Sequence, residues 1–400
     1  MSLSVGIVGL PNVGKSTLFK ALTKRQVDCA NYPFCTIEPN KGIVAVPDER
    51  LKALAKLSKS AKIVPATIEF VDIAGLVAGA SKGEGLGNKF LSHIREVDAI
   101  IEVVRGFENP DIVHVAGKID PAADIETINY ELIFADLETL GRRLSELKNQ
   151  AKSGPTPELK KKIELAEKIK ARLEEGKMVN SLDFSKDEIL EIRDLHFLTQ
   201  KAILYVLNVD ERGLSLSSPF STRSPSERGV RGLRGISTDE KIPPALASGL
   251  PLIKGENMEG MFLDLADKFS PIIPICAKLE SELAELAENE TQEYLKDLGL
   301  QATGLETLIK ESFKILGLIT FLTTGPDETR GWTIKAGTKA PAAAGVIHTD
   351  FEKGFIRAEI INYDDYVKYG EQGAKEKGLM RLEGKDYVMR DNDVCYFRVA

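Results

Sequence analysis

Short apolar runs recur along the chain and are separated by stretches with helical spacing. The runs are rich in branched apolar residues, so they predict buried strands. They lie at 3–8, 42–46, 66–72, 99–104, 202–207 and 270–276. Helical spacing is present at 17–22, at the acidic stretch 280–296 and at the amphipathic stretch 304–316. Strands that alternate with helices predict an α/β fold.

The stretch from about 130 to 200 differs from this pattern, because Leu, Glu, Lys and Arg dominate it. Its leucines repeat in steps of three and four, which is the spacing of a coiled-coil seam. These are Leu137, Leu140, Leu144 and Leu147, and a similar stripe resumes with Leu159, Ile163, Ala166 and Leu173. Residues 153–157 contain Gly and Pro and break the helix between the stripes. The pattern predicts two antiparallel helices that project as an arm, or simply a stable helical hairpin.

Two further segments stand apart. Residues 212–257 are rich in Ser, Arg, Gly and Pro without an apolar period, which predicts a flexible insertion. Its arginines could contact RNA, although a solvated loop suits the composition better. Strands at 318–323, 329–335, 355–361 and 394–399, with a helix at 340–349, predict a small α+β unit. The expected organisation is an α/β domain at 1–129 and 201–316, an arm at 130–200 and a C-terminal unit at 317–400.

Composition narrows the class of protein. The chain has 400 residues, which suggests two or three domains, and 43% hydrophobic with 28% charged residues is typical of a soluble globular protein. A net charge of −7 gives no reason to expect DNA as a partner. The four cysteines have neither disulfide-framework nor zinc spacing. No leader or long apolar run is present, so we expect a cytoplasmic protein without a membrane partner.

Residues 9–16 read Gly-Leu-Pro-Asn-Val-Gly-Lys-Ser, the spacing of a phosphate-binding loop between a strand and a helix. Backbone N–H groups at a helix N-terminus favour bound anions. Lys15 is expected to reach the β- and γ-phosphates, and the Ser16 hydroxyl to ligate Mg²⁺. The residues expected to hold the nucleotide here are Asn12, Val13, Gly14, Lys15, Ser16 and Thr17. The alternative is a glycine-rich turn that binds nothing.

Three further positions complete the expected metal and γ-phosphate site. Thr36 lies in a loop after the first helix, where a P-loop switch has a threonine that closes over Mg²⁺. Asp72 ends a predicted strand and is expected to support the ion. Gly75 follows closely and leaves room for a backbone N–H to meet the γ-phosphate. The glycine-rich stretch 76–91 is expected to be the second switch.

Leu76 occupies the place of the glutamine that orients water in Ras-type proteins, and an aliphatic side chain cannot do this. Here the chain resembles the Obg-like ATPases of the YchF group, which have an apolar residue at this position. Residues 34–36, 72–76 and 83–90 carry the resemblance. It implies that His114 aids hydrolysis, and imidazole chemistry is suited to positioning or deprotonating water. A surface histidine without a catalytic role is the alternative.

The strand at 202–207 ends in Asn208-Val209-Asp210-Glu211, where a GTPase would have Asn-Lys-x-Asp. A glutamate in place of that aspartate weakens guanine recognition, and it would face the N1 acceptor of adenine without a proton between them. The Obg-like ATPases have a similarly altered motif and prefer ATP. By this resemblance Asn208 and the backbone of Val209 face the adenine, and Glu211 belongs to the same site. Cys276 and Ala277 resemble the Ser-Ala-Lys motif that flanks the base, with cysteine replacing serine.

The resemblance covers nearly the whole chain except the insertion. It implies a Ras-like P-loop NTPase domain, a coiled-coil insertion and a C-terminal ubiquitin-like TGS domain of the β-grasp type. The expected activity is slow, Mg²⁺-dependent hydrolysis of ATP, and of GTP less well, in a switch associated with ribosomes or ribosomal RNA and with stress regulation. A GTP-specific translation GTPase and a nucleotide-stabilised RNA-binding module are the alternatives. The sequence leaves the oligomeric state open.

Overall fold

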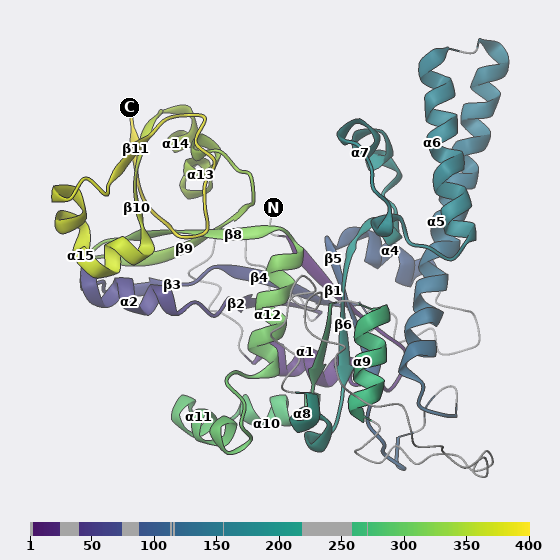
Figure 1. The fold of residues 1–400 in the computed structure, drawn as a ribbon, viewed down its shortest axis with the longest axis horizontal. Helices are drawn as coiled ribbons and strands as arrows, with labels where there is room; N and C mark the ends of the chain where they lie inside the picture. Colours follow the sequence, from purple (N-terminus) through teal and green to yellow (C-terminus); the bar gives the residue numbers. More distant parts are fainter. Residues whose placement is uncertain are drawn as a thin grey trace, which may run out of the picture.

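In the part of the chain that the structure describes, two six-stranded sheets carry the fold, and a helical arm projects away from both (Figure 1). The structure is a computed structural model. It describes residues 3–24, 40–73, 88–112, 114, 117–154, 156–217, 258–269 and 271–400. Within these residues, no helix is both long and apolar enough to cross a membrane.

The first sheet has the strand order β2-β4-β1-β5-β6-β7, with β2 antiparallel to β4 and the other neighbours parallel. Its strands are β1 (Ser4–Val8), β2 (Lys41–Ala45), β4 (Thr67–Asp72), β5 (Ala99–Arg105), β6 (Ala202–Asn208) and β7 (Ile272–Ile275). Its helices are α1 (Lys15–Thr23), α4 (Asn88–Glu96), α8 (Glu211–Ser217), α9 (Met258–Lys268), α10 (Ala277–Leu283), α11 (Glu288–Asp297) and α12 (Gly304–Ile315). The α/β prediction is confirmed.

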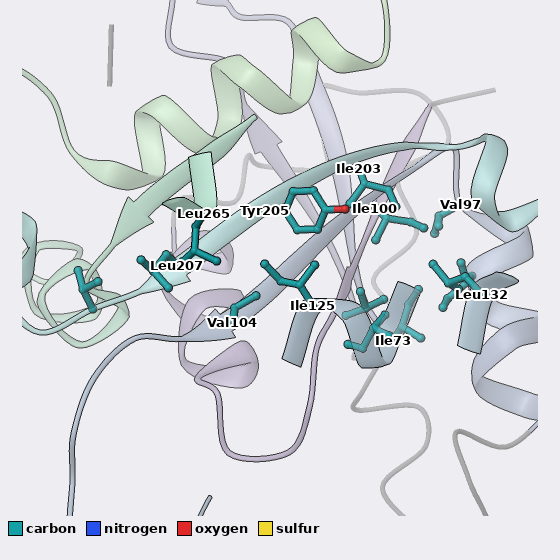
Figure 2. Packing of buried hydrophobic residues seen from close by; sticks show 14 of the residues in the cluster. Ile73, Val97, Ile100, Val104, Ile125, Leu132, Ile203, Tyr205, Leu207 and Leu265 are labelled. Atoms are coloured by element: carbon teal, nitrogen blue, oxygen red, sulfur yellow. The ribbon is translucent and has the colours of Figure 1, made fainter. Parts of the chain in front are cut away.

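Both faces of this sheet are buried, which explains its continuous apolar strands. On β5, Ile100 and Val104 face one hydrophobic cluster, and Ile101 and Val103 face another. Figure 2 shows the first cluster, in which these strands meet helices α5 and α9. The second cluster takes up the apolar faces of α1 and α12. With both faces closed, the carboxyl ends of the parallel strands are the accessible place for a ligand.

The arm is built on α5 (Pro121–Ser153), which runs antiparallel to α6 (Pro157–Glu174) (Figure 1). Of the first leucine stripe, Leu140, Leu144 and Leu147 are buried between the helices, and Leu137 is partly buried. The return to the sheet passes through η2 (Val179–Ser181), α7 (Lys186–Ile192), η3 (Arg193–Leu195) and η4 (Leu198–Gln200). Buried Asp136 on α5 accepts hydrogen bonds from the Leu198 and Thr199 backbone N–H groups at 2.9 and 2.8 Å. These contacts attach η4 to α5 at the base of the arm.

The second sheet has the order β11-β10-β12-β8-β9-β3. Its C-terminal elements are β8 (Leu318–Thr324), β9 (Glu328–Lys335), α13 (Ala340–Ile347), α14 (Thr349–Lys353), β10 (Phe355–Asn362), α15 (Tyr363–Glu376), β11 (Arg381–Glu383) and β12 (Asp393–Val399). The four predicted strands are confirmed. The expectation of a single helix in this region was wrong, because α14 and α15 are also present. Residues 280–296 likewise form parts of two helices, α10 and α11, rather than one.

The sequence did not predict that residues from the N-terminal part would complete this sheet. β3 (Lys62–Val64) pairs in parallel with β9, and α2 (Glu49–Ser58) buries Leu51 and Leu54 in a cluster with C-terminal residues. Arg50 on α2 donates to the Asp391 carboxylate at 2.9 Å. The segment between β2 and β4 is therefore packed as a part of the C-terminal unit.

α8 was also not predicted, since it occupies residues at the start of the stretch expected to be flexible. Leu214 of this helix is buried in the core, and the Gly213 N–H donates to the Asp210 carboxylate at 2.8 Å. Burial and this cap explain a helix in a sequence without apolar periodicity. Residues 218–257 lie outside the described residues.

Leu54→Ala tests the packing of α2 against the C-terminal unit. Leu54 is fully buried, so its truncation is expected to lower the free energy of unfolding by about 2–5 kcal/mol. Leu57→Ala on the same helix is the control, because Leu57 is 48% exposed and should change the free energy by less than about 0.5 kcal/mol. Chemical denaturation of both variants measures this. Equal effects of the two substitutions would contradict the assigned packing.

Candidate functional site

A cavity of about 760 Å³ lies at the carboxyl ends of β1, β5, β6 and β7. This volume is in the range of small-molecule and cofactor sites. The phosphate-loop side is lined by Asn12, Gly14, Lys15, Ser16 and Thr17. The other lining residues lie at or after the carboxyl ends of β5, β6 and β7: Phe107, Glu108, Asn109, Ile112, Asn208, Val209, Asp210, Glu211, Arg212, Cys276, Ala277 and Lys278. The fold thus brings most of the candidate residues to one cavity.

The backbone of the loop 9–14 requires glycine at both ends. Gly9 has φ +145°, and a Cβ there would lie 2.3 Å from the Val103 carbonyl oxygen. Gly14 has φ +103°, and a Cβ there would lie 2.2 Å from Nδ2 of Asn208. Helix α1 begins directly after Gly14, so the N–H groups of its first turn point toward the cavity end of the loop. This arrangement is suited to an anion.

Lys15 is held at the start of α1 with only 8% of its surface exposed. Its Nζ donates a hydrogen bond to the Leu10 carbonyl at 2.5 Å. Burial lowers the pKa of the Lys15 ammonium to about 8, while the Asp72 carboxylate acts in the opposite direction and raises it. A buried cation of this kind would be stabilised by a bound polyphosphate.

Asn208 joins two of the loops that line the cavity. Its Nδ2 donates to the Val13 carbonyl at 2.8 Å, and its Oδ1 accepts from the Ala277 N–H at 3.0 Å. The Val13 side chain is itself buried in the core, so only its backbone faces this junction. Both ends of the Asn208 carboxamide are therefore engaged between the phosphate loop and the loop after β7.

The remaining base-side candidates differ in exposure. Val209 is buried, and its N–H donates to the Ile275 carbonyl at 2.8 Å. Glu211 is exposed at the start of α8. Cys276 is buried at the N-cap of α10, and burial raises the pKa of its thiol. The carboxylate at Glu211 is thus accessible to a ligand, whereas the Cys276 thiol remains protonated.

Ser16 and Asp72 offer oxygen donors of the kind that Mg²⁺ prefers. Ser16 is exposed in the first turn of α1 and lines the cavity. Asp72 ends β4 and is buried, and its register partner on β1 is Ile7, two residues before the phosphate loop begins at Gly9. The donor set fits the ion. Thr36 and Gly75 lie outside the described residues, as does the stretch 74–87.

His114 does not line the cavity. It is buried, and its Nε2 lies 2.9 Å from Oδ2 of Asp124 on α5. The pKa of Asp124 is raised overall, because the effect of burial exceeds the opposite effect of the hydrogen bond to His114. The nearby Glu102 carboxyl is fully buried, and burial, together with Asp124, raises its pKa well above the usual value. The structure therefore places the histidine in a buried acidic cluster beside the cavity.

Sequence reasoning missed the loop after β5 as a wall of the cavity. Phe107, Glu108, Asn109 and Ile112 all line it. A usable signal was present, because this loop follows the carboxyl end of a central parallel strand.

This fold and cavity define a P-loop nucleotide-binding protein with a Ras-like α/β domain. A family model described as "50S ribosome-binding GTPase" matches residues 4–136. A second model, YchF-GTPase_C, described as "Protein of unknown function (DUF933)", matches residues 318–400. The chain belongs to the YchF family, because full-length relatives of that name are 49–50% identical to it.

Relatives of known name match along the whole chain. "Ribosome-binding ATPase YchF" of Pasteurella multocida (strain Pm70) is 50% identical, over 100% of this chain and 99% of the relative. The protein of the same name from Bacillus subtilis (strain 168) is 49% identical over the same shares. The solved structure of the Schizosaccharomyces pombe YchF GTPase is 36% identical, covers 99% of this chain and 98% of that chain, and has a TM-score of 0.82. This likeness confirms the predicted fold class, including the helical insertion and the TGS-like C-terminal unit.

The Lys15 environment can be tested with Asp72→Asn. Removing a nearby negative charge disfavours the ammonium, so the pKa of Lys15 is expected to fall below about 8. NMR titration of the lysine side chains in ¹³C-labelled protein measures the value. Asp98→Asn is the control, since Asp98 precedes β5 at the opposite end of the sheet and should leave Lys15 unchanged. An unchanged or higher Lys15 pKa in Asp72→Asn would contradict the assigned coupling.

Proposed function

We propose that this protein is a Mg²⁺-dependent ATPase that hydrolyses ATP to ADP and phosphate, and GTP less well. The observation that carries this proposal is the pairing of a phosphate loop with an accessible Glu211 in one cavity. The name of the Pasteurella multocida and Bacillus subtilis relatives, "Ribosome-binding ATPase YchF", supports it. We further propose that the protein acts at the ribosome, as a regulatory switch in translation or in the stress response.

The phosphate side follows from the cavity. The backbone of 12–17 and the Lys15 ammonium would hold the phosphates, and the Gly75 N–H would meet the γ-phosphate. Ser16, Thr36 and Asp72 would hold Mg²⁺, which neutralises charge on the phosphate oxygens when bound. Leu76 cannot orient the attacking water, so intrinsic turnover is expected to be slow and stimulated by a partner.

On the base side, Asn208 and Ala277 would fix the shape of the site, and the backbone of Val209 would face the adenine. Guanine presents an N1–H donor where adenine presents an N1 acceptor, so an aspartate at this place selects guanine. Glu211, the first residue of α8, stands at this place and is longer than aspartate by one methylene group. The longer side chain weakens the selection for guanine without excluding it. Cys276 would contribute its backbone, because its thiol is buried and protonated.

The proposed domains separate the nucleotide site from the arm and from the C-terminal unit. The nucleotide domain comprises 1–129 and 201–316, and 212–257 is an insertion within it whose first residues belong to α8. The arm comprises 130–200, and the TGS domain comprises 317–400.

Nucleotide titration tests the proposed specificity. Calorimetry with Mg²⁺ and non-hydrolysable analogues should give tighter binding for ATP than for GTP. Lys15→Ala should weaken both at least about tenfold, because it removes a charge-assisted contact to the phosphates. Tighter binding of GTP would favour a GTP-specific translation GTPase instead. Tight ATP binding with no hydrolysis, alone or with ribosomes, would favour a nucleotide-stabilised binding module.

His114→Gln tests the proposed catalytic role of this residue. If the imidazole positions or deprotonates water, kcat should fall about 100-fold or more while ATP affinity is unchanged. This requires the ring to leave Asp124 during turnover, since it is buried against that carboxylate. His93→Gln on α4 is the control, because His93 pairs with Glu96 on the helix surface. A lower melting temperature with unchanged kcat would show that His114 is only structural.

A further inference from the structure

Arg105 is an unusual residue for the place that it occupies. It ends the central strand β5, and only 2% of its surface is exposed. A buried guanidinium carries a large desolvation cost, which is tolerated only when its donors are well paired. The contacts of its guanidinium therefore indicate the role of Arg105 in the structure.

The guanidinium donates to three backbone carbonyls of the loop that follows it. Nε donates to Phe107 at 3.0 Å, Nη1 to Ile112 at 2.9 Å and Nη2 to Asn109 at 3.2 Å. The guanidinium carbon also lies 4.6 Å from the centre of the Phe107 ring. One side chain thus holds both ends and the middle of residues 107–112.

The three residues held in this way, Phe107, Asn109 and Ile112, all line the nucleotide cavity. The loop begins beside the base side of the cavity, because the Gly106 N–H donates to the Asn208 carbonyl at 2.8 Å. A Cβ at Gly106 would lie 2.9 Å from Leu207, so the backbone of the loop approaches β6 closely. The loop is therefore a wall of the nucleoside end of the cavity.

We propose that Arg105 is a positioning residue that holds the loop 106–112 in the shape of this wall and so sets the affinity for the nucleoside part of the ligand. The inference rests on the proposed nucleotide function and extends it to a residue outside the cavity. Arginine suits the task because its planar fork can donate in several directions at once. Lysine has a single charged centre and cannot span three separated carbonyls.

The experiment compares a ligand that has a nucleoside with one that lacks it. Calorimetry with Mg²⁺ measures the affinity of wild type, Arg105→Met and Arg105→Lys for a non-hydrolysable ATP analogue and for inorganic tripolyphosphate. Arg105→Met should weaken the ATP analogue about tenfold or more and change tripolyphosphate by less than about twofold. The affinity of Arg105→Lys for the ATP analogue should lie between those of Arg105→Met and the wild-type protein. Arg143→Met is the matched control, since Arg143 is on the arm and pairs with Glu146 at 3.4 Å.

The outcomes separate the possible roles. The inference would be overturned if Arg105→Met bound the ATP analogue as tightly as the wild-type protein does. It would also be overturned if Arg105→Lys had the full wild-type affinity for this analogue. An equal loss for both ligands would also overturn it, because that indicates a structural role without selectivity for the nucleoside end. If Arg105→Met does not fold, Arg105→Lys decides by the same ratio of the two affinities. Wild-type protein that fails to bind the ATP analogue would instead count against the proposed ATPase.

Discussion

The nucleotide site depends on the Asn208 carboxamide, which joins loops from distant parts of the chain. It donates to Val13 and accepts from Ala277, so one buried side chain sets the distance between the phosphate loop and the loop after β7. Gly14 allows this contact, because any Cβ there would meet the amide nitrogen. A rigid junction of this kind keeps a binding site formed before its ligand arrives, which reduces the entropy that binding costs.

The second sheet connects this site to the C-terminal unit. The segment between β2 and β4 contributes α2 and β3 to that unit, and β4 ends at Asp72 beside the phosphate loop. Ser60 and Thr329 bond across this boundary at 2.7 Å, and Arg50 bonds to Asp391. The C-terminal unit is therefore held next to the strand that carries the proposed metal carboxylate by the buried Leu51 and Leu54 and by these hydrogen bonds.

One helix, α5, extends from the candidate residue His114 to the tip of the arm. α5 begins beside His114, whose ring pairs with Asp124 in the first turn of the helix, and the 33 residues of this helix extend to the tip of the arm. At 1.5 Å per residue, this is a continuous rod about 50 Å long. Its lower turns pack on β5 and β6 (Figure 2), while its upper turns pack on α6 and other elements of the arm. The same helix thus belongs both to the packing of the first sheet and to the arm.

The sequence by itself determined the elements whose signal is local. The phosphate loop, the buried strands and the leucine stripes of the arm each follow from spacing over a few turns or one strand, so they could be predicted without knowing any partner. Only the tertiary structure decided which distant residues meet. It placed α2 and β3 in the C-terminal sheet, used Asn208 as a joint between loops, paired His114 with Asp124 and buried Arg105 beneath the loop after β5. Such contacts depend on burial and on the register of strands that are far apart in the sequence. Neither of these produces a periodic pattern of residues from which it could be predicted.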